Sequence, residues 1–217
     1  MYSDKKVILN TDVVLIDIIG FSDLDSMKQF KCINFITNIY RKMIAQMLKN
    51  SNMSLNKFIL GLVSTSDGFY CILNPRLQGY GAILGLSFDH LSYQISKKLK
   101  YINGMRIAVH NTQIYEFKDI LGHTNIIGDG LDECSGYLEF KYHAISTVLV
   151  SDSAYISFTK FLSIYKDYNA LLIEKGFKHS EIYTFKDTHN EEKKGTLIWL
   201  GESGIINPPN INFNSVR

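Results

Sequence analysis

Two aspartates, Asp17 and Asp67, have the residue type and the placement needed to hold divalent cations. Asp17 lies in the apolar run 13–19, and Asp67 lies in the turn between two strand-like runs. Two carboxylates that converge repel each other unless a cation lies between them. Mg²⁺ or Mn²⁺, with phosphate oxygens completing the shell, is the usual cation. Spacing alone also allows a second interpretation, in which Asp17 caps a strand end and Asp67 is an ordinary turn residue.

A third candidate is Arg106, one of only four arginines in a lysine-rich chain. It falls in the strand-like run 105–110, where alternation places Arg106 and His110 on one face. On an open sheet face an arginine can bind phosphate oxygens with its planar fork, although a surface ion pair is the alternative. We interpret His110 as a structural histidine, and Lys193 and Lys194 as residues of a solvated turn.

The elements that must position these residues follow from apolar periodicity. The predicted order is strand 13–19, helix 26–50, strands 57–64 and 68–73, helix 79–100 and strand 105–110. This is the α+β, ferredoxin-like βαββαβ order, with both helices on one sheet face. Its first and third strands are neighbours, which would bring Asp17 and Asp67 together.

The remaining chain predicts a C-terminal extension that ends in a β-hairpin. We expect a loop over 111–128, a short helix at 131–140, a strand at 145–151, a helix at 152–165, and a hairpin of 181–185 with 196–200. Residues 1–201 would form one domain. Residues 202–217 would form a tail that frays unless it docks on a partner.

Composition limits the class of protein. Of 217 residues, 46% are apolar and 20% charged, which is enough for a buried core. We expect no membrane partner, because no apolar run approaches the roughly 20 residues that cross a bilayer. A net charge of +2 predicts no nucleic-acid partner. Three scattered cysteines and a polar N-terminus favour a reducing cytoplasm without disulfides or structural zinc.

Several segments, in chain order over about 13–155, resemble the catalytic domain of class III nucleotidyl cyclases. Residues 15–24 (LIDIIGFSDL) resemble the opening motif Asp-Ile-x-Gly-Phe-Thr-x-Leu, and 64–69 (STSDGF) resemble Gly-Asp-Gly-Phe with Ser66 at the first glycine. Residues 104–110 (GMRIAVH) look like the family's central strand. Residues 127–132 (IGDGLD) are similar to its Gly-x-x-Val-Asn helix start, and 147–151 (TVLVS) to the strand that follows.

The resemblance implies a two-metal cyclisation of a nucleoside triphosphate. Asp17 and Asp67 would hold two Mn²⁺ or Mg²⁺ ions, and the Ile18 carbonyl would ligate one of them. Backbone N–H groups of residues 18–24, including Phe21, would wrap the triphosphate. The metals would activate the ribose 3′-hydroxyl and neutralise the departing pyrophosphate. The family's sites lie between two catalytic domains, which implies a homodimer of this chain.

The sequence departs from the family pattern at two pairs of positions. Val63 and Asn125 match the positions where purine cyclases place base-reading residues, and a valine cannot hydrogen-bond to adenine. Asp132 and Gly136 match the transition-state pair Asn-x-x-x-Arg, so the usual arginine is missing. Arg106 is the candidate replacement.

A chain that keeps both metal-binding aspartates but lacks the purine-reading pair resembles the bacterial pyrimidine cyclases of anti-phage defence. That resemblance implies conversion of UTP or CTP to cyclic UMP or cyclic CMP, with a separate effector protein that senses the product. Two alternatives stay open, an adenylate or guanylate cyclase and a catalytically silent nucleotide-binding module.

Overall fold

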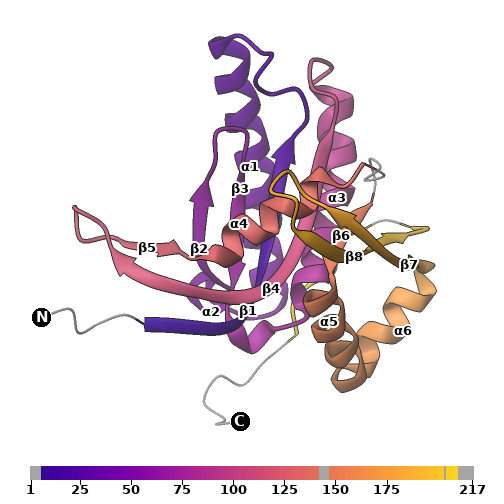
Figure 1. Cartoon of the computed structure of the whole chain (residues 1–217). Coiled ribbons are helices and arrows are strands. Elements are labelled where there is room, and N and C mark those ends of the chain that lie inside the picture. Colours follow the sequence, from indigo (N-terminus) through magenta and orange to yellow (C-terminus); the bar gives the residue numbers. More distant parts are fainter. Residues whose placement is uncertain (1–5, 142–146, 203, 210–217) are drawn as a thin grey trace, which may run out of the picture.

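The computed structural model describes residues 6–141, 147–202 and 204–209. Within them the chain forms an eight-stranded sheet in the order β2-β3-β1-β4-β6-β8-β7, with β5 paired to β4 (Figure 1). The α+β class predicted from the sequence is confirmed. No helix in this described part combines the length and the apolar character needed to cross a membrane.

The first half of the chain forms the predicted βαββαβ core. Its strand order, β2-β3-β1-β4, is that of a ferredoxin-like sheet, and β1 pairs antiparallel with both β3 and β4. Its elements are β1 (Lys6–Ile18), α1 (Ser26–Asn50), α2 (Leu55–Phe58), β2 (Ile59–Ser64), β3 (Gly68–Leu73), η1 (Pro75–Leu77), α3 (Tyr80–Lys98) and β4 (Met105–Lys118).

The second half extends the sheet beyond β4. Strand β6 runs parallel to β4, and β8 lies between β6 and β7. Its elements are β5 (Thr124–Ile127), α4 (Asp129–Gly136), η2 (Tyr137–Glu139), β6 (Val148–Ser151), α5 (Asp152–Ile164), α6 (Lys166–Glu174), β7 (Phe177–Lys186) and β8 (Glu192–Leu200).

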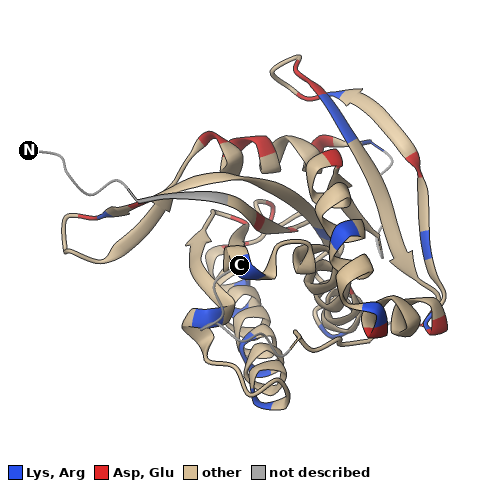
Figure 2. Cartoon of the chain, turned by 90° about the horizontal axis from the view of Figure 1, so that it is seen from below, with Lys and Arg blue, Asp and Glu red and all other residues tan. Residues whose placement is uncertain are grey.

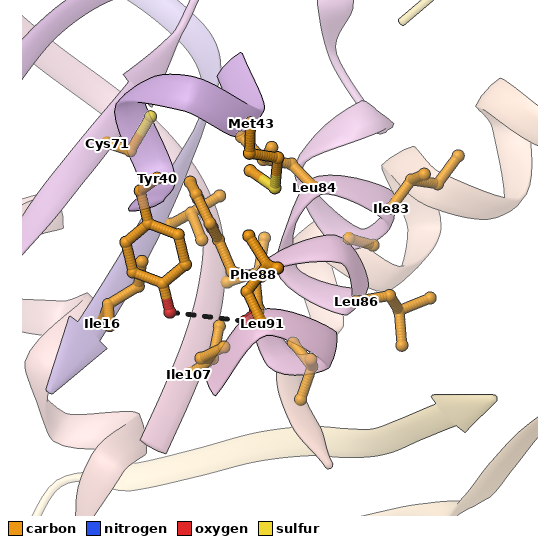
Figure 3. Packing of buried hydrophobic residues seen from close by; sticks show 14 of the residues in the cluster. Ile16, Tyr40, Met43, Cys71, Ile83, Leu84, Leu86, Phe88, Leu91 and Ile107 are labelled. Carbon is orange, nitrogen blue, oxygen red and sulfur yellow. Dashed lines mark hydrogen bonds between the residues drawn. The ribbon is translucent and has the colours of Figure 1, made fainter. Parts of the chain in front are cut away.

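Helices α1 and α3 cover one face of the sheet with the main core. The buried stripe of α1 has the helical spacing seen in the sequence, and its members are Cys32, Ile36, Tyr40, Met43 and Met47. Figure 3 shows Tyr40 packed between Ile16 of β1 and Phe88 of α3. The Tyr40 hydroxyl donates to the Phe88 carbonyl at 3.3 Å, so this large buried ring keeps its polar atom satisfied.

The opposite face is partly covered by α4 and η2. Leu131, Cys134 and Tyr137 pack there against Leu15 and Ala108 in a second apolar cluster. Met105, Ile107 and Val109 belong to the first cluster instead, which confirms the predicted alternation along β4. The face that carries Asp17 and Arg106 is therefore roofed by α4 rather than fully open.

The predicted loop over 111–128 is wrong. Strand β4 continues to Lys118 and pairs with β5, while the added residues at the start of β1 pair with the same part of β4. The turn is closed by Asp119, whose Oδ1 accepts from the backbone N–H groups of Leu121 and His123. We call the paired segments of β4 and β5, residues 112–127, the β4–β5 arm. No apolar pattern indicated this arm because few of its residues are buried.

Two more differences lie near the C-terminus. Helix α6 was not predicted, and part of the expected tail packs on its own domain. Ile206 is buried, the Tyr80 hydroxyl donates to its carbonyl, and Ser51 Oγ donates to the Pro208 carbonyl at 2.9 Å. Residues 145–146 of the predicted strand and 210–217 of the tail lie outside the described residues.

Charge is segregated between the two faces. Helix α1 carries five cations and no acid, namely Lys28, Lys31, Arg41, Lys42 and Lys49. Helix α4 with η2 carries four acids and no cation, namely Asp129, Asp132, Glu133 and Glu139. Figure 2 shows these blue and red groups on different sides of the molecule. The net charge of +2 conceals this separation.

Asp12 ties β1 to the start of α3 and makes stability depend on pH. Its carboxylate accepts from the backbone N–H groups of Gly79 and Gly81 at 2.7 and 2.8 Å, and from Asn111 Nδ2 at 2.7 Å. Burial nevertheless raises the pKa of Asp12 from 3.8 to about 6. The folded state therefore binds this proton more tightly than the unfolded chain does.

We expect this carboxyl to stabilise the fold most below pH 3.8, and to lose that contribution as pH rises through about 6. The shift corresponds to about 3 kcal/mol of unfolding free energy. Urea unfolding of the native chain and of Asp12→Asn at pH 4 and pH 7 measures it. Between these two pH values the unfolding free energy of the native chain should fall by most of that amount, about 2.4 kcal/mol, relative to that of the variant. A difference that does not change with pH would contradict the assignment.

Candidate functional site

Asp17 and Arg106 face each other across β1 and β4. They are direct partners in the register of the antiparallel pair, so both side chains project from the same sheet face. Arg106 donates to one oxygen of Asp17, Oδ2, from Nε at 2.9 Å and from Nη2 at 2.6 Å. Its third contact is from Nη1 to the Leu138 carbonyl at 3.0 Å. No sequence pattern indicated that carbonyl as a partner.

Asp67 reaches the same place because the β2–β3 turn lies against the end of β1. Asp17 pairs with Gly68 in the register, and the Asp67 carbonyl accepts from the Ile18 N–H at 2.9 Å. A Cβ on Gly68 would lie 1.8 Å from the Ile16 carbonyl oxygen, so only glycine allows this approach. The hydroxyl groups of Thr65 and Ser66 donate hydrogen bonds to the Asp67 carboxylate at 3.2 and 3.3 Å.

The two acids converge as the strand order required. Burial raises the pKa of the Asp17 carboxyl, and Asp67 raises it further by its charge and through a hydrogen bond between the carboxyl groups. Arg106 opposes that rise. Two ionised carboxylates and one guanidinium leave a net negative charge at this point, which a divalent cation would balance. The oxygen-only donor set, two carboxylates and the nearby Ile18 carbonyl, fits Mg²⁺ or Mn²⁺.

No group of three or more His, Cys, Asp or Glu side chains forms a metal cage in the part of the chain that the structure describes. The pair Asp17 and Asp67 therefore offers only part of a coordination shell. Mg²⁺ typically keeps such sparse protein ligation, with one or two carboxylates and substrate phosphates completing it.

The loop between β1 and α1 passes next to the acids. Gly20 adopts φ +77°, in the left-handed region, and Phe21 buries its side chain in the main core. Phe21 N–H donates to the Ile18 carbonyl, and so is already engaged. The N–H groups of Gly20, Ser22 and Asp23 find no protein acceptor among the described residues. They are the groups that this loop can offer to phosphate oxygens.

Of the predicted base-reading pair, Val63 lies on β2 and Asn125 on the β4–β5 arm. Val63 is the cross-strand partner of Tyr70, whose ring is largely buried beneath α4. Asn125 is exposed, and its Oδ1 accepts from the neighbouring Ile126 N–H at 2.9 Å. Asp132 is exposed in the first turn of α4.

His110 and Lys193 form polar contacts under α4. His110 bonds Ser151 Oγ through Nδ1 at 2.9 Å and Glu133 through Nε2 at 2.8 Å, which supports its interpretation as structural. Lys193 is not in a solvated turn, because it is buried and paired with Asp187 at 3.4 Å and with Glu191 at 2.9 Å. A Cβ on Gly136 would meet Asp187 and Lys193 at 3.0 and 3.1 Å, so this position is crowded.

Three solved structures that share this architecture are cyclase domains. The guanylyl cyclase Cya2 aligns with a TM-score of 0.60 at 12% identity, covering 98% of this chain and 99% of that chain. The guanylate cyclase domain of RhGC from Catenaria anguillulae, in complex with GTP, aligns at 0.55 and 13% identity, covering 90% and 98%. A bacterial light-regulated adenylyl cyclase aligns at 0.54 and 11%, covering 94% of this chain and 54% of that chain.

Comparison with protein-family models and with curated protein sequences finds no match. At these identities the structural likeness establishes the fold, which is the fold of cyclase catalytic domains. It does not by itself assign an activity, so function has to be argued from the site.

Proposed function

We propose that this chain is a nucleotidyl cyclase that converts a pyrimidine nucleoside triphosphate, UTP or CTP, to its 3′,5′-cyclic monophosphate and pyrophosphate. The observation that carries the proposal is the convergence of Asp17 and Asp67 beside a loop with unused N–H groups. The fold shared with guanylyl and adenylyl cyclase domains supports it.

The chain's own residues would divide the work as follows. Asp17, Asp67 and the Ile18 carbonyl would hold two divalent cations, Mn²⁺ or Mg²⁺, and the loop from Ile18 to Asp23 would bind the triphosphate. Such cations supply Lewis acidity, which lowers the pKa of the attacking 3′-hydroxyl and neutralises the leaving pyrophosphate. Arg106 would add a cation at the phosphates.

The preference for a pyrimidine rests on the neighbourhood of Val63. Valine offers no hydrogen bond to a base, and the Tyr70 ring beside it occupies space on the same sheet face. A purine base at this position would therefore meet the Val63 side chain and the Tyr70 ring without a polar partner from Val63. Asn125 would be the remaining polar group for the base, and asparagine can present a donor or an acceptor to uracil or cytosine. Asp132, at the position of the transition-state asparagine, would lie on the substrate side of α4.

The experiment is to incubate the purified chain with ATP, GTP, CTP or UTP and Mn²⁺, and to identify each product by mass. We expect cyclic UMP or cyclic CMP to predominate, since Val63 offers no hydrogen bond to a purine base. Cyclic AMP or cyclic GMP as the main product would support a purine cyclase instead. Absence of product with all four would favour a silent nucleotide-binding module.

The site also calls for a second copy of the chain. The Ile126 side chain packs at Gly61, which lies six residues before Asp67. Gly61 pairs with Ile72, four residues along β3 from Gly68, which is the partner of Asp17. At about 3.3 Å per residue this places Ile126 roughly 13 Å along the strands from Asp17 and two strands away, farther than the base lies from the α-phosphate of one nucleotide. A homodimer would let the acids of one protomer meet Val63 and Asn125 of the other.

We expect sedimentation velocity at micromolar concentration, with Mn²⁺ and a triphosphate present, to show a dimer. Exposed apolar side chains on the β4–β5 arm, among them Phe117, Ile120 and Leu121, are available for such contact. A monomer under these conditions would contradict a shared site. The anti-phage role and a separate effector that senses the product remain part of the proposal and rest on the resemblance in sequence. A cytoplasmic location also remains part of it and rests on the three scattered cysteines and the polar N-terminus.

A further inference from the structure

The contact between Arg106 and Asp17 places a side-chain cation where a metal ion would bind. Two N–H groups of one guanidinium converge on the same oxygen, Asp17 Oδ2, at 2.9 and 2.6 Å. An oxygen that accepts two charge-assisted hydrogen bonds has little lone-pair density left for another cation. Metal ligation by this oxygen and the ion pair with Arg106 therefore compete.

Arg106 is held so that it can leave Asp17 without leaving the site. Its Nη1 donates to the Leu138 carbonyl at 3.0 Å, and that bond involves neither acid. The Arg106 side chain is 37% exposed, whereas that of Asp17 is 10% exposed. The guanidinium thus has one fixed anchor on η2 and a solvent-accessible side toward which Nε and Nη2 can turn.

We propose that Arg106 is an exchangeable counter-ion for the metal site. In the metal-free chain it neutralises Asp17, and when a divalent cation binds Asp17 it turns about the Leu138 anchor toward the triphosphate. This inference rests on the proposed function, because it takes Asp17 as a metal ligand. It adds that metal affinity is set by competition from within the chain.

The exchange couples metal to nucleotide. A cation that binds alone must displace Arg106 and leave the guanidinium without its anion. A cation that arrives with a triphosphate gives the guanidinium a new anionic partner. Each ligand should therefore strengthen the binding of the other, as thermodynamic linkage requires. Because Leu138 follows α4 in the chain, the exchange would also reach the helix that roofs the site.

The test is a calorimetric titration of nucleotide-free protein with Mn²⁺ alone. Arg106→Met removes the competitor, and we expect it to bind Mn²⁺ about tenfold more tightly than the native chain. Arg106→Lys should fall between them, because a single ammonium holds Asp17 less well than a fork. Arg41→Met, which alters an exposed arginine of α1, should match the native chain.

The effects of an Arg106 substitution on Mn²⁺ affinity and on turnover distinguish the proposed exchange of Arg106 for a metal ion from a purely structural role. A residue needed only for folding would weaken Mn²⁺ binding when removed, whereas exchange predicts tighter binding despite slower turnover. Thermal melts should show that Mn²⁺ raises the melting temperature of Arg106→Met more than that of the native chain. If Arg106→Met fails to fold, Arg106→Lys still carries both measurements.

The failures are distinguishable. Unchanged or weaker Mn²⁺ binding by both Arg106 variants, with binding still lost in Asp17→Ala, would overturn the exchange and leave the metal site standing. Binding that is the same in the native chain, in Arg106→Met and in Asp17→Ala would overturn the exchange together with the proposed metal site.

Discussion

Replacing either Asp17 or Asp67 by alanine is expected to reduce cyclase turnover by roughly three orders of magnitude or more, to background. Each carboxylate would contribute to holding both cations, so neither can substitute for the other. The fold should survive, because neither acid belongs to an apolar cluster, and Arg106, which loses its partner in Asp17→Ala, is 37% exposed and keeps its bond to the Leu138 carbonyl. Turnover with Mn²⁺ and all four triphosphates, beside a thermal melt, measures both quantities.

The matched control is Asp167→Ala, which removes an exposed aspartate from α6, away from β1 and β3. It should keep native turnover. If Asp17→Ala or Asp67→Ala kept near-native rates while remaining folded, the two-metal mechanism would be wrong. The other candidate, a silent binding module, would then explain the fold and the acids.

Arg106→Ala is expected to lower the rate of cyclisation by about two to three orders of magnitude. The chain lacks the arginine that the family pattern places at Gly136, and Lys193 is already neutralised by Asp187 and Glu191. Arg106 lies on the same sheet face as Asp17 and is its cross-strand partner. Its loss should therefore remove a charge-assisted contact made to the phosphates in the transition state.

Arg106→Lys distinguishes a forked contact from simple positive charge. We expect it to recover only a small part of the rate, because an ammonium replaces a bidentate guanidinium. The measurement is kcat and KM with the preferred triphosphate, and a fall confined to kcat indicates a contact made in the transition state. Full activity of Arg106→Ala would show that Arg106 forms only a structural ion pair with Asp17 and does not act in catalysis.

The sequence by itself determined the sheet core and the two acids. Apolar runs identified β1, β3 and the start of β4, and apolar residues at helical spacing identified α1 and α3, because these elements bury much of their surface in the core. The βαββαβ order then implied that β1 and β3 are neighbours, and the convergence of Asp17 with Asp67 followed. Burial of a face leaves a local pattern, so these conclusions needed no tertiary information.

Only the tertiary structure decided where Arg106 points and what surrounds it. The register of β1 against β4 places its guanidinium on Asp17, and the position of η2 supplies the Leu138 carbonyl. The β4–β5 arm was missed because its residues are largely exposed, and exposure leaves no apolar period to read. Contacts between residues distant in the chain depend on how the sheet is assembled, and no local pattern encodes them.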